Sequence, residues 1–181
     1  TALANSGANG VSGISAGLST LPDDPVIAAL SAQAKTTLTA NWTNAGNNLS
    51  TIYRVDLATS ADFTTVDKTQ LSPANATDLS MTGLTPNTTY YARVTALANS
   101  GANGVSGIST GLSTLPDDPV IGALSAQAQT SLTANWTNAA NSVTTIYRVD
   151  LATSSDFTTV DKTQVAPANA IILVMTGLSP H

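Results

Sequence analysis

The feature that most constrains this chain is an internal repeat. Residues 1–15 recur unchanged as residues 95–109, an offset of 94 residues that holds to the end of the 181-residue sequence. When residues 1–87 are aligned with residues 95–181, only 16 of the 87 positions differ. Cores tolerate wide substitution at constant volume, so a shared fold alone would not require this similarity. It indicates a recent duplication or a homogenised array of one structural unit.

A turn-rich segment sets the phase of the repeat. The sequence Leu-Pro-Asp-Asp-Pro occupies residues 21–25 and again residues 115–119. Proline and paired aspartates disfavour both helix and central strand, so we expect unit boundaries there. This phase predicts the C-terminal strands (end of F, and G) of a preceding unit in residues 1–22, a complete domain in residues 23–116, and strands A to E of a following unit in residues 117–181.

Apolar and polar residues alternate with a period of two, the pattern of half-buried β-strands. Leu38, Ala40 and Trp42 alternate with polar residues, and residues 90–96 show the same pattern. Stretches rich in Asn, Gly, Ser and Pro separate these runs, as turns do. The pattern predicts an all-β fold in which each unit is a sandwich of seven short strands.

Several segments resemble fibronectin type III domains. Residues 84–96 resemble the family's E–F corner and F strand, Trp42 resembles its B-strand tryptophan, and Tyr53-x-Val55 resembles its C strand. The resemblance covers the whole chain and implies tandem immunoglobulin-like sandwiches, one complete and two partial, as in bacterial-type extracellular repeat proteins. It implies strands over residues 26–33, 36–43, 51–58, 63–70, 76–82, 88–98 and 105–114.

The same resemblance implies which aromatic residues form the core. Tyr90 would be the corner tyrosine, with its ring in the core and its hydroxyl bonded to nearby backbone, and Trp42 would pack between the sheets. The expected core residues are Trp42, Tyr53, Leu84, Tyr90, Trp136 and Tyr147.

Composition leaves little for catalysis. The chain has no Cys and no Glu, and its one His is the last residue, His181. Cysteine nucleophiles, thiolate zinc sites and His-activated hydroxyls are therefore excluded. The Gly-rich residues 100–107 lack the lysine of a phosphate-binding loop and precede a predicted strand, so we interpret them as an F–G hairpin loop. We expect no enzyme and no cofactor.

Charge and hydropathy limit the partners. Charged residues make up 9% of the sequence, apolar residues 42%, and the net charge is −5. An acidic chain is a poor partner for the phosphate backbone of nucleic acids. No apolar run approaches the roughly 20 residues that a membrane helix needs. We expect no nucleic-acid partner, no membrane span, and a location outside the cell or at its surface.

Paired aspartates lie at both predicted boundaries. Asp23 with Asp24, and Asp117 with Asp118, could hold calcium and stiffen a tandem array. Calcium takes about 6–8 oxygen ligands, however, so we prefer a solvated linker and assign no metal site.

Five Asn-x-Ser/Thr sequons could carry N-linked sugars. Asn48, Asn75 and Asn87 are expected on loops, whereas Asn41 and Asn135 are expected to point outward from strand B. The second copy lacks the three loop sequons, and chance sequons are expected in a chain this rich in Asn and Thr. Covalent glycans, N-linked or O-linked, stay an open alternative.

One strand breaks the alternation. Residues 77–81 read Thr-Asp-Leu-Ser-Met, but their counterparts 171–175 read Ile-Ile-Leu-Val-Met. A strand that is apolar on both faces is normally buried on both faces. Either another module or subunit covers this strand, or the change is drift.

These observations favour a structural role in an extracellular fibre, stalk or filament, with neighbouring repeats or identical subunits as partners. Two mechanisms are open: the chain is a window of a longer polypeptide, or residues 1–20 of one molecule complete the sandwich of residues 118–181 of the next. We favour the window, because no copy could donate the missing F strand. The alternative function is a spacer or binding module of an adhesin or a polysaccharide-degrading enzyme. Only Tyr91 clearly faces outward among the aromatic residues, so sugar recognition ranks low.

Overall fold

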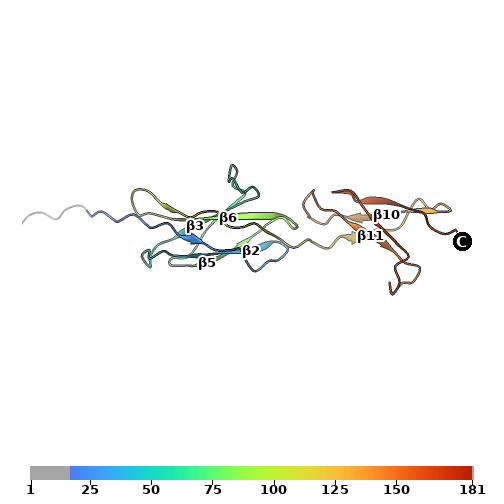
Figure 1. Cartoon of the computed structure of the whole chain (residues 1–181), viewed down its shortest axis with the longest axis horizontal. Coiled ribbons are helices and arrows are strands. Elements are labelled where there is room, and N and C mark those ends of the chain that lie inside the picture. The colour runs from blue at the N-terminus through green and yellow to red at the C-terminus, as the bar shows by residue number, and fades with distance from the viewer. Residues whose placement is uncertain (1–16, 181) are drawn as a thin grey trace, which may run out of the picture.

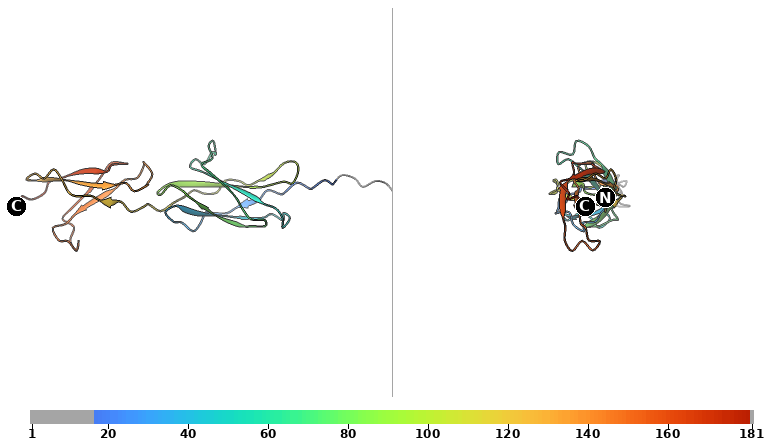
Figure 2. Two further views of the ribbon diagram at one scale, coloured as in Figure 1. Left: turned by 180° about the vertical axis from the view of Figure 1, so that it is seen from behind. Right: turned by 90° about the vertical axis from the view of Figure 1, so that its right-hand side faces the viewer.

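The computed structural model describes residues 17–180, and all regular elements in them are β-strands. Two sandwiches follow one another along the long axis of the molecule (Figure 1). Each is built around its own cluster of buried side chains. Viewed along that axis, the two sandwiches lie one behind the other (Figure 2).

The first sandwich consists of two antiparallel sheets. One sheet has the order β1-β2-β5, and the other has the order β4-β3-β6-β7, with β8 also paired to β6. The strands are β1 (Val26–Ile27), β2 (Thr37–Thr43), β3 (Tyr53–Ala58), β4 (Lys68–Leu71), β5 (Asp78–Thr82), β6 (Thr89–Ala96), β7 (Gly104–Val105) and β8 (Leu112–Ser113).

The alternating sequence places one face of each long strand in the core. In β2, the side chains of Leu38, Ala40 and Trp42 are buried, and the residues between them are only partly covered. The rings of Trp42 and Tyr53 meet across the sheets with centroids 5.4 Å apart at 55°. This tilted packing is close to the edge-to-face arrangement that aromatic pairs prefer.

The second sandwich repeats this arrangement. Its sheets are β13-β10-β9 and β11-β12. Met175 pairs with Leu132 as Met81 pairs with Leu38. Within the described residues, β11 pairs only with β12, whereas β3 pairs with both β4 and β6. The strands are β9 (Val120–Ile121), β10 (Ser131–Thr137), β11 (Arg148–Leu151), β12 (Lys162–Val165) and β13 (Ile172–Thr176).

The all-β tandem fold is confirmed. Four of the expected strands of the first sandwich each differ from the observed bounds by no more than three residues in total, whereas the other three differ more. Only β1 and an isolated bridge at Ser31 form within residues 26–33. The expected strand 63–70 starts at Lys68, because Phe63 has a φ of 52° and belongs to a turn. The expected strand 105–114 is divided into β7 and β8.

Serine hydroxyls explain the division of the last strand. Ser106 Oγ accepts a hydrogen bond from Val94 N at 2.9 Å, and Ser109 Oγ accepts one from Ala92 N at 2.8 Å. These hydroxyls replace backbone carbonyls as partners of β6, so β6 stays satisfied while the facing chain departs from regular pairing.

The proposed unit boundaries at residues 22–23 and 116–117 stay predictions. Most of the expected preceding unit, residues 1–16, and the last residue, His181, lie outside the described residues. Residues 17–20 are described and contain no regular element.

Candidate functional site

The junction between the sandwiches contains hydrogen bonds, an ion pair and a pocket. Here the linker (residues 115–119) is bonded to both sides. Leu115 N donates to Ala34 O of the first sandwich at 3.0 Å, and Leu115 O accepts from Asn87 N at 3.1 Å. Asp117 N donates to Asn141 Oδ1 at 2.7 Å, and Asn141 Nδ2 donates back to Asp117 O at 2.8 Å. The linker is therefore fixed at both ends rather than free to swivel.

The two sandwiches also contact each other directly. The β5–β6 corner (residues 83–88) meets the β10–β11 loop (residues 138–147). Ser142 N donates to Pro86 O at 3.1 Å, and Asn87 Nδ2 donates to Thr145 Oγ1 at 2.8 Å. Asn87 has a φ of 51°, a left-handed conformation that Asn tolerates better than most residues. Its side chain is thereby directed across the junction.

A lysine connects the first sandwich to the aspartate pair of the linker. Lys35 Nζ lies 2.8 Å from Asp117 Oδ1 and 2.8 Å from Asp118 Oδ2. The hydrogen bonds to the two carboxylates raise the pKa of Lys35. The Lys35 hydrogen bond, followed by one from Asp118 N, lowers the pKa of Asp117. Both shifts favour the charged forms that hold the contact together.

The aspartate pairs considered for calcium have other partners. Asp117 and Asp118 face the Lys35 ammonium group, and Asp24 Oδ1 accepts a hydrogen bond from Val105 N at 2.8 Å. In residues 17–180, no three His, Cys, Asp or Glu side chains gather as a metal site would require.

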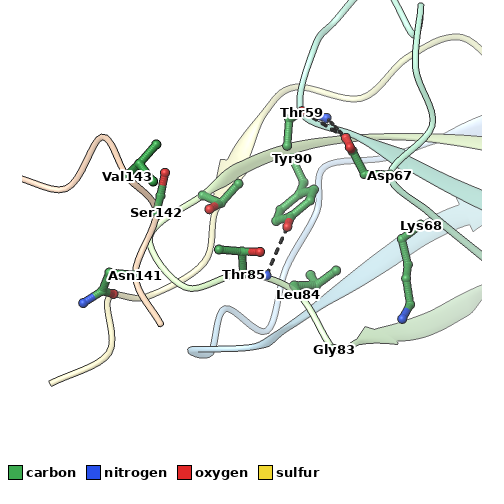
Figure 3. A pocket seen from close by; sticks show the side chains of 11 residues that line it. Thr59, Asp67, Lys68, Gly83, Leu84, Thr85, Tyr90, Asn141, Ser142 and Val143 are labelled. Atoms are coloured by element: carbon green, nitrogen blue, oxygen red, sulfur yellow. Dashed lines mark hydrogen bonds between the residues drawn. The ribbon is translucent and has the colours of Figure 1, made fainter. Parts of the chain in front are cut away.

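A pocket of about 490 Å³ opens beside the junction. Figure 3 shows Tyr90, Asp67 and Lys68 on the side of the first sandwich and Ser142 on the other. Tyr90 Oη accepts a hydrogen bond from Thr85 N at 3.1 Å. Asp67 Oδ2 accepts bonds from Thr59 N and Thr59 Oγ1, at 2.6 and 2.9 Å. These hydrogen bonds of the pocket groups hold turns of the fold in place.

The sequons on the central strands have engaged amides. Asn41 Nδ2 donates to Ala29 O at 3.0 Å and to Ser31 Oγ at 2.9 Å. Asn135 makes the equivalent bonds at 2.8 and 3.0 Å. In both copies this amide ties the segment after the first strand to the middle strand. Glycosylation at Nδ2 would remove a donor from this contact.

The loop sequons differ. Asn48 and Asn75 are exposed. Asn48 Oδ1 accepts hydrogen bonds from Ser50, and Asn75 Oδ1 accepts one from Asn44 Nδ2, but neither side-chain nitrogen has a partner among residues 17–180. Asn87 is half-buried, and its Nδ2 is occupied at the junction. The structure therefore separates the five sequons by the state of the amide nitrogen.

The residues expected in the core, five aromatic residues and Leu84, occupy two separate clusters. Trp42, Tyr53, Leu84 and Tyr90 lie in the first, and Trp136 and Tyr147 lie in the second. Their side chains pack in the two cores, and Leu84 and Tyr90 also line the pocket beside the junction.

Two junction residues were not singled out from the sequence. Lys35 is one of only three lysines in the chain, and Gln129 replaces it in the second copy. Asn141 is identical in both copies, as are most residues, so its identity carried no signal. Both act over separations that period-two patterns do not describe.

A comparison of the sequence with protein-family models agrees with this all-β fold. The model of the fibronectin type III domain matches residues 24–111. This part of the chain belongs to the fibronectin type III family. The second sandwich repeats the first five strand positions of that domain at the 94-residue offset.

Solved structures show the same fold. A two-domain fibronectin type III segment from chicken tenascin is similar over 88% of this chain and 84% of its own length, with 18% identity and a TM-score of 0.50. The FN5 domain of Drosophila Lar aligns over 52% of this chain and 98% of its own, at 21% identity and a TM-score of 0.38. The TM-score of the Lar domain is too low to support the fold assignment. No curated protein sequence matches this chain significantly. Residues 17–180 contain no helix that is long and apolar enough to cross a membrane.

Proposed function

We propose that this chain is a non-enzymatic structural segment of an extracellular or cell-surface fibre, in which fibronectin type III modules are joined end to end. The junction carries the proposal. Its linker is bonded to both sandwiches, and the sandwiches are bonded to each other through Pro86 and Asn87. A free linker between modules would need none of these contacts, and relative motion is the ordinary expectation for tandem domains.

Repetition extends this local stiffness to a whole array. In quasi-one-dimensional repeat proteins, each unit contacts only its neighbours, so one interface sets the geometry of the series. The two copies here differ at only 16 of 87 aligned positions, but Lys35 and Asn87 are replaced by Gln129 and His181 in the second copy. Equivalent interfaces can therefore recur between copies that keep these two residues. The partners in this proposal are neighbouring repeats or identical subunits.

Spin-label distances across the junction test the proposal. The chain has no cysteine, so Ala61→Cys and Ser155→Cys place labels only at two exposed loop positions that correspond between copies. We expect a narrow distance distribution. A variant with Pro116→Gly and Asp117→Gly supplies the flexible reference, since glycine frees the linker. A native distribution as broad as that reference would refute the proposal.

One observation favours a second function, that of a spacer or binding module in a larger adhesin or polysaccharide-degrading enzyme. Ile172 and Val174 on β13 are 55% and 53% exposed, where the first copy has Asp78 and Ser80. Apolar side chains on an outer sheet face are typical of covered surfaces. The variant Ile172→Asp with Val174→Ser restores the first-copy residues. If it abolishes surface attachment of the parent protein but leaves the label distances unchanged, the binding role is favoured over the fibre.

A further inference from the structure

We infer that the N-terminal end of the first sandwich is a docking surface for the β5–β6 corner of another copy of the same repeat. The inference rests on the proposed function and specifies its interface. The surface, called the N-terminal pole, consists of residues 21–23 and the β2–β3 loop residues 46–52. It lines a groove of about 630 Å³.

The second sandwich supplies the template. Its β10–β11 loop receives the β5–β6 corner through Ser142 N and Thr145 Oγ1. At the 94-residue offset, the counterparts of these residues at the N-terminal pole are Asn48 and Thr51. Neither Asn48 N nor Thr51 Oγ1 has a hydrogen-bond partner among residues 17–180. The pole thus presents the same donor and acceptor that are satisfied at the junction.

The two loops share a backbone conformation. Thr51 N donates to Asn48 O at 2.9 Å, as Thr145 N donates to Ser142 O at 2.9 Å. The carbonyl oxygen of Thr51 accepts a hydrogen bond from Asn75 N at 2.9 Å. The carbonyl oxygen of Thr145 accepts one from Asn169 N, the counterpart of Asn75, at the same distance. The docking groups are therefore held in the same local geometry in both copies.

The linker leaves both loops in the same way. Asp23 N donates to Asn47 Oδ1 at 2.8 Å, and Asn47 Nδ2 donates to Asp23 O at 3.0 Å. This reproduces the reciprocal pair of Asp117 and Asn141. The chain therefore approaches the pole along the path that it follows through the junction.

An exposed leucine identifies the occupant as a further repeat. Leu18 is 94% exposed, although its counterpart Leu112 packs against the first core and pairs with Tyr90. Residues 17–21 have the sequence of residues 111–115. Leu18 is thus placed to add to the sheet of a docked copy as Leu112 adds to the first sandwich.

Charge supports the same occupant. The pole carries the carboxylate of Asp23, the next residue is Asp24, and both are exposed. At the junction, Lys35 supplies the ammonium group for the corresponding pair. A docked copy that carries this lysine would supply the same cation, together with a corner of sequence Leu-Thr-Pro-Asn, as in residues 84–87. We expect its proline carbonyl to accept from Asn48 N and its asparagine to donate to Thr51 Oγ1.

An extended chain tests the inference. A further copy of residues 24–94 is placed before Thr1, so that it continues into residues 1–22 as one complete repeat. Labels at residue 61 of the added copy and at Ala61→Cys span the new junction. Labels at Ala61→Cys and Ser155→Cys span the existing one. We expect the two distance distributions to have the same mean and width.

Two variants show whether the named contact is responsible. Thr51→Val removes the acceptor hydroxyl and should broaden the distribution at the new junction, as Thr145→Val should at the existing one. Thr43→Val, on an exposed strand position, should broaden neither. A narrow existing junction beside a broad new one, or a new junction indifferent to Thr51→Val, would overturn the inference but leave the proposed function standing. Broad distributions at both junctions would overturn the proposed function itself.

Discussion

Lys35 Nζ lies 2.8 Å from Asp117 Oδ1, although the two residues are 82 positions apart in the sequence. The contact joins the first sandwich to the linker that leads to the second. The Lys35 and Asp117 side chains are 44% and 37% exposed, so water screens the pair and its contribution to folding stability is small. Its effect is geometric, because it selects one direction for the linker. The lysine therefore controls the junction more than the sandwich.

Replacing this lysine separates the two effects. Lys35→Gln introduces the residue that stands at position 129 of the second copy. We expect a broader label-to-label distance distribution across the junction and an unchanged midpoint of urea unfolding, because water screens the exposed pair. Lys68→Gln, which has no ion pair among the described residues, is the matched control. An equal broadening in both variants would show that general charge, not this contact, orders the junction.

The junction should also depend on pH. The pKa of Asp117 is lowered in the folded chain. Its contribution to the stability of the contact is therefore present above the ordinary carboxyl pKa of 3.8 and is lost as pH falls through the lower pKa of the folded state. The pKa of Lys35 is raised, so its contribution is lost only as pH rises beyond 10.5. We expect a constant label distance between these limits and broadening outside them. Broadening near pH 6 would contradict this assignment, since neither group titrates there.

We expect that Gly104 in β7 cannot be replaced without strain, because the backbone of Asp23 and Asp24 passes close to it. A Cβ on Gly104 would lie 2.8 Å from Asp23 C and 3.1 Å from Asp24 N, with Asp23 O closer still. Gly104→Ala should displace this segment, destabilise the first sandwich by about 1–3 kcal/mol, and speed hydrogen exchange at Val105 N, which donates to Asp24. Gly107→Ala is the control, because its Cβ would meet nothing within 4 Å. Unchanged exchange at Val105 in the Gly104 variant would disprove the expectation.

The fold was predictable because its signal is local. The alternation at Leu38, Ala40 and Trp42 indicated a strand, for which the family resemblance implied the bounds 36–43, and β2 spans Thr37–Thr43. The strand expected from residue 63 failed because the Asp62 carboxylate accepts bonds from Thr64 N and Thr64 Oγ1, both at 3.1 Å, and organises a turn instead. The family resemblance implied a strand there, although a polar side chain determines the backbone conformation.

The junction was not predictable because its contacts are not local. The paired aspartates and prolines predicted a turn-rich boundary, but period-two patterns contain no register between one sandwich and the next. The partners of Asn87 and Lys35 lie 58 and 82 positions away. Glycosylation at Asn87 was inferred from residue type alone and stays a prediction. Calcium at the aspartates beside Lys35 was considered on the same ground, and no metal site was assigned.

The corner hydroxyl should contribute measurably to the first sandwich. Tyr90 Oη accepts from Thr85 N at 3.1 Å while its ring lies in the core (Figure 3). Tyr90→Phe keeps the ring and leaves Thr85 N without this acceptor, so we expect a loss of about 1–2 kcal/mol in urea unfolding. Tyr91→Phe removes a hydroxyl that has no bond among residues 17–180 and should be nearly neutral. Equal losses in the two variants would contradict a specific role for the corner bond.

The five sequons should differ as acceptors in the folded chain. Asn48 and Asn75 are exposed with uncommitted amide nitrogens, whereas the amide of Asn41 is held by Ala29 O and Ser31 Oγ. Transfer to Nδ2 must replace an N–H bond, so the engaged amide resists it. When the folded chain is incubated with a soluble N-glycosyltransferase and its sugar nucleotide, peptide mass spectrometry should find sugar at the first two and none at Asn41 or Asn135.

Asn87 gives this prediction an internal control. Among residues 17–180, its Nδ2 donates only to Thr145 Oγ1, across the junction. Thr145→Val should therefore raise modification at Asn87 and leave Asn41 unmodified, because the bonds of Asn41 lie within the first sandwich. Sugar at Asn41 in the folded chain would contradict the ranking. If Asn87 were fully modified in the unsubstituted chain, the junction contact would have to be open in solution, and the stiffness attributed to it would be lost as well.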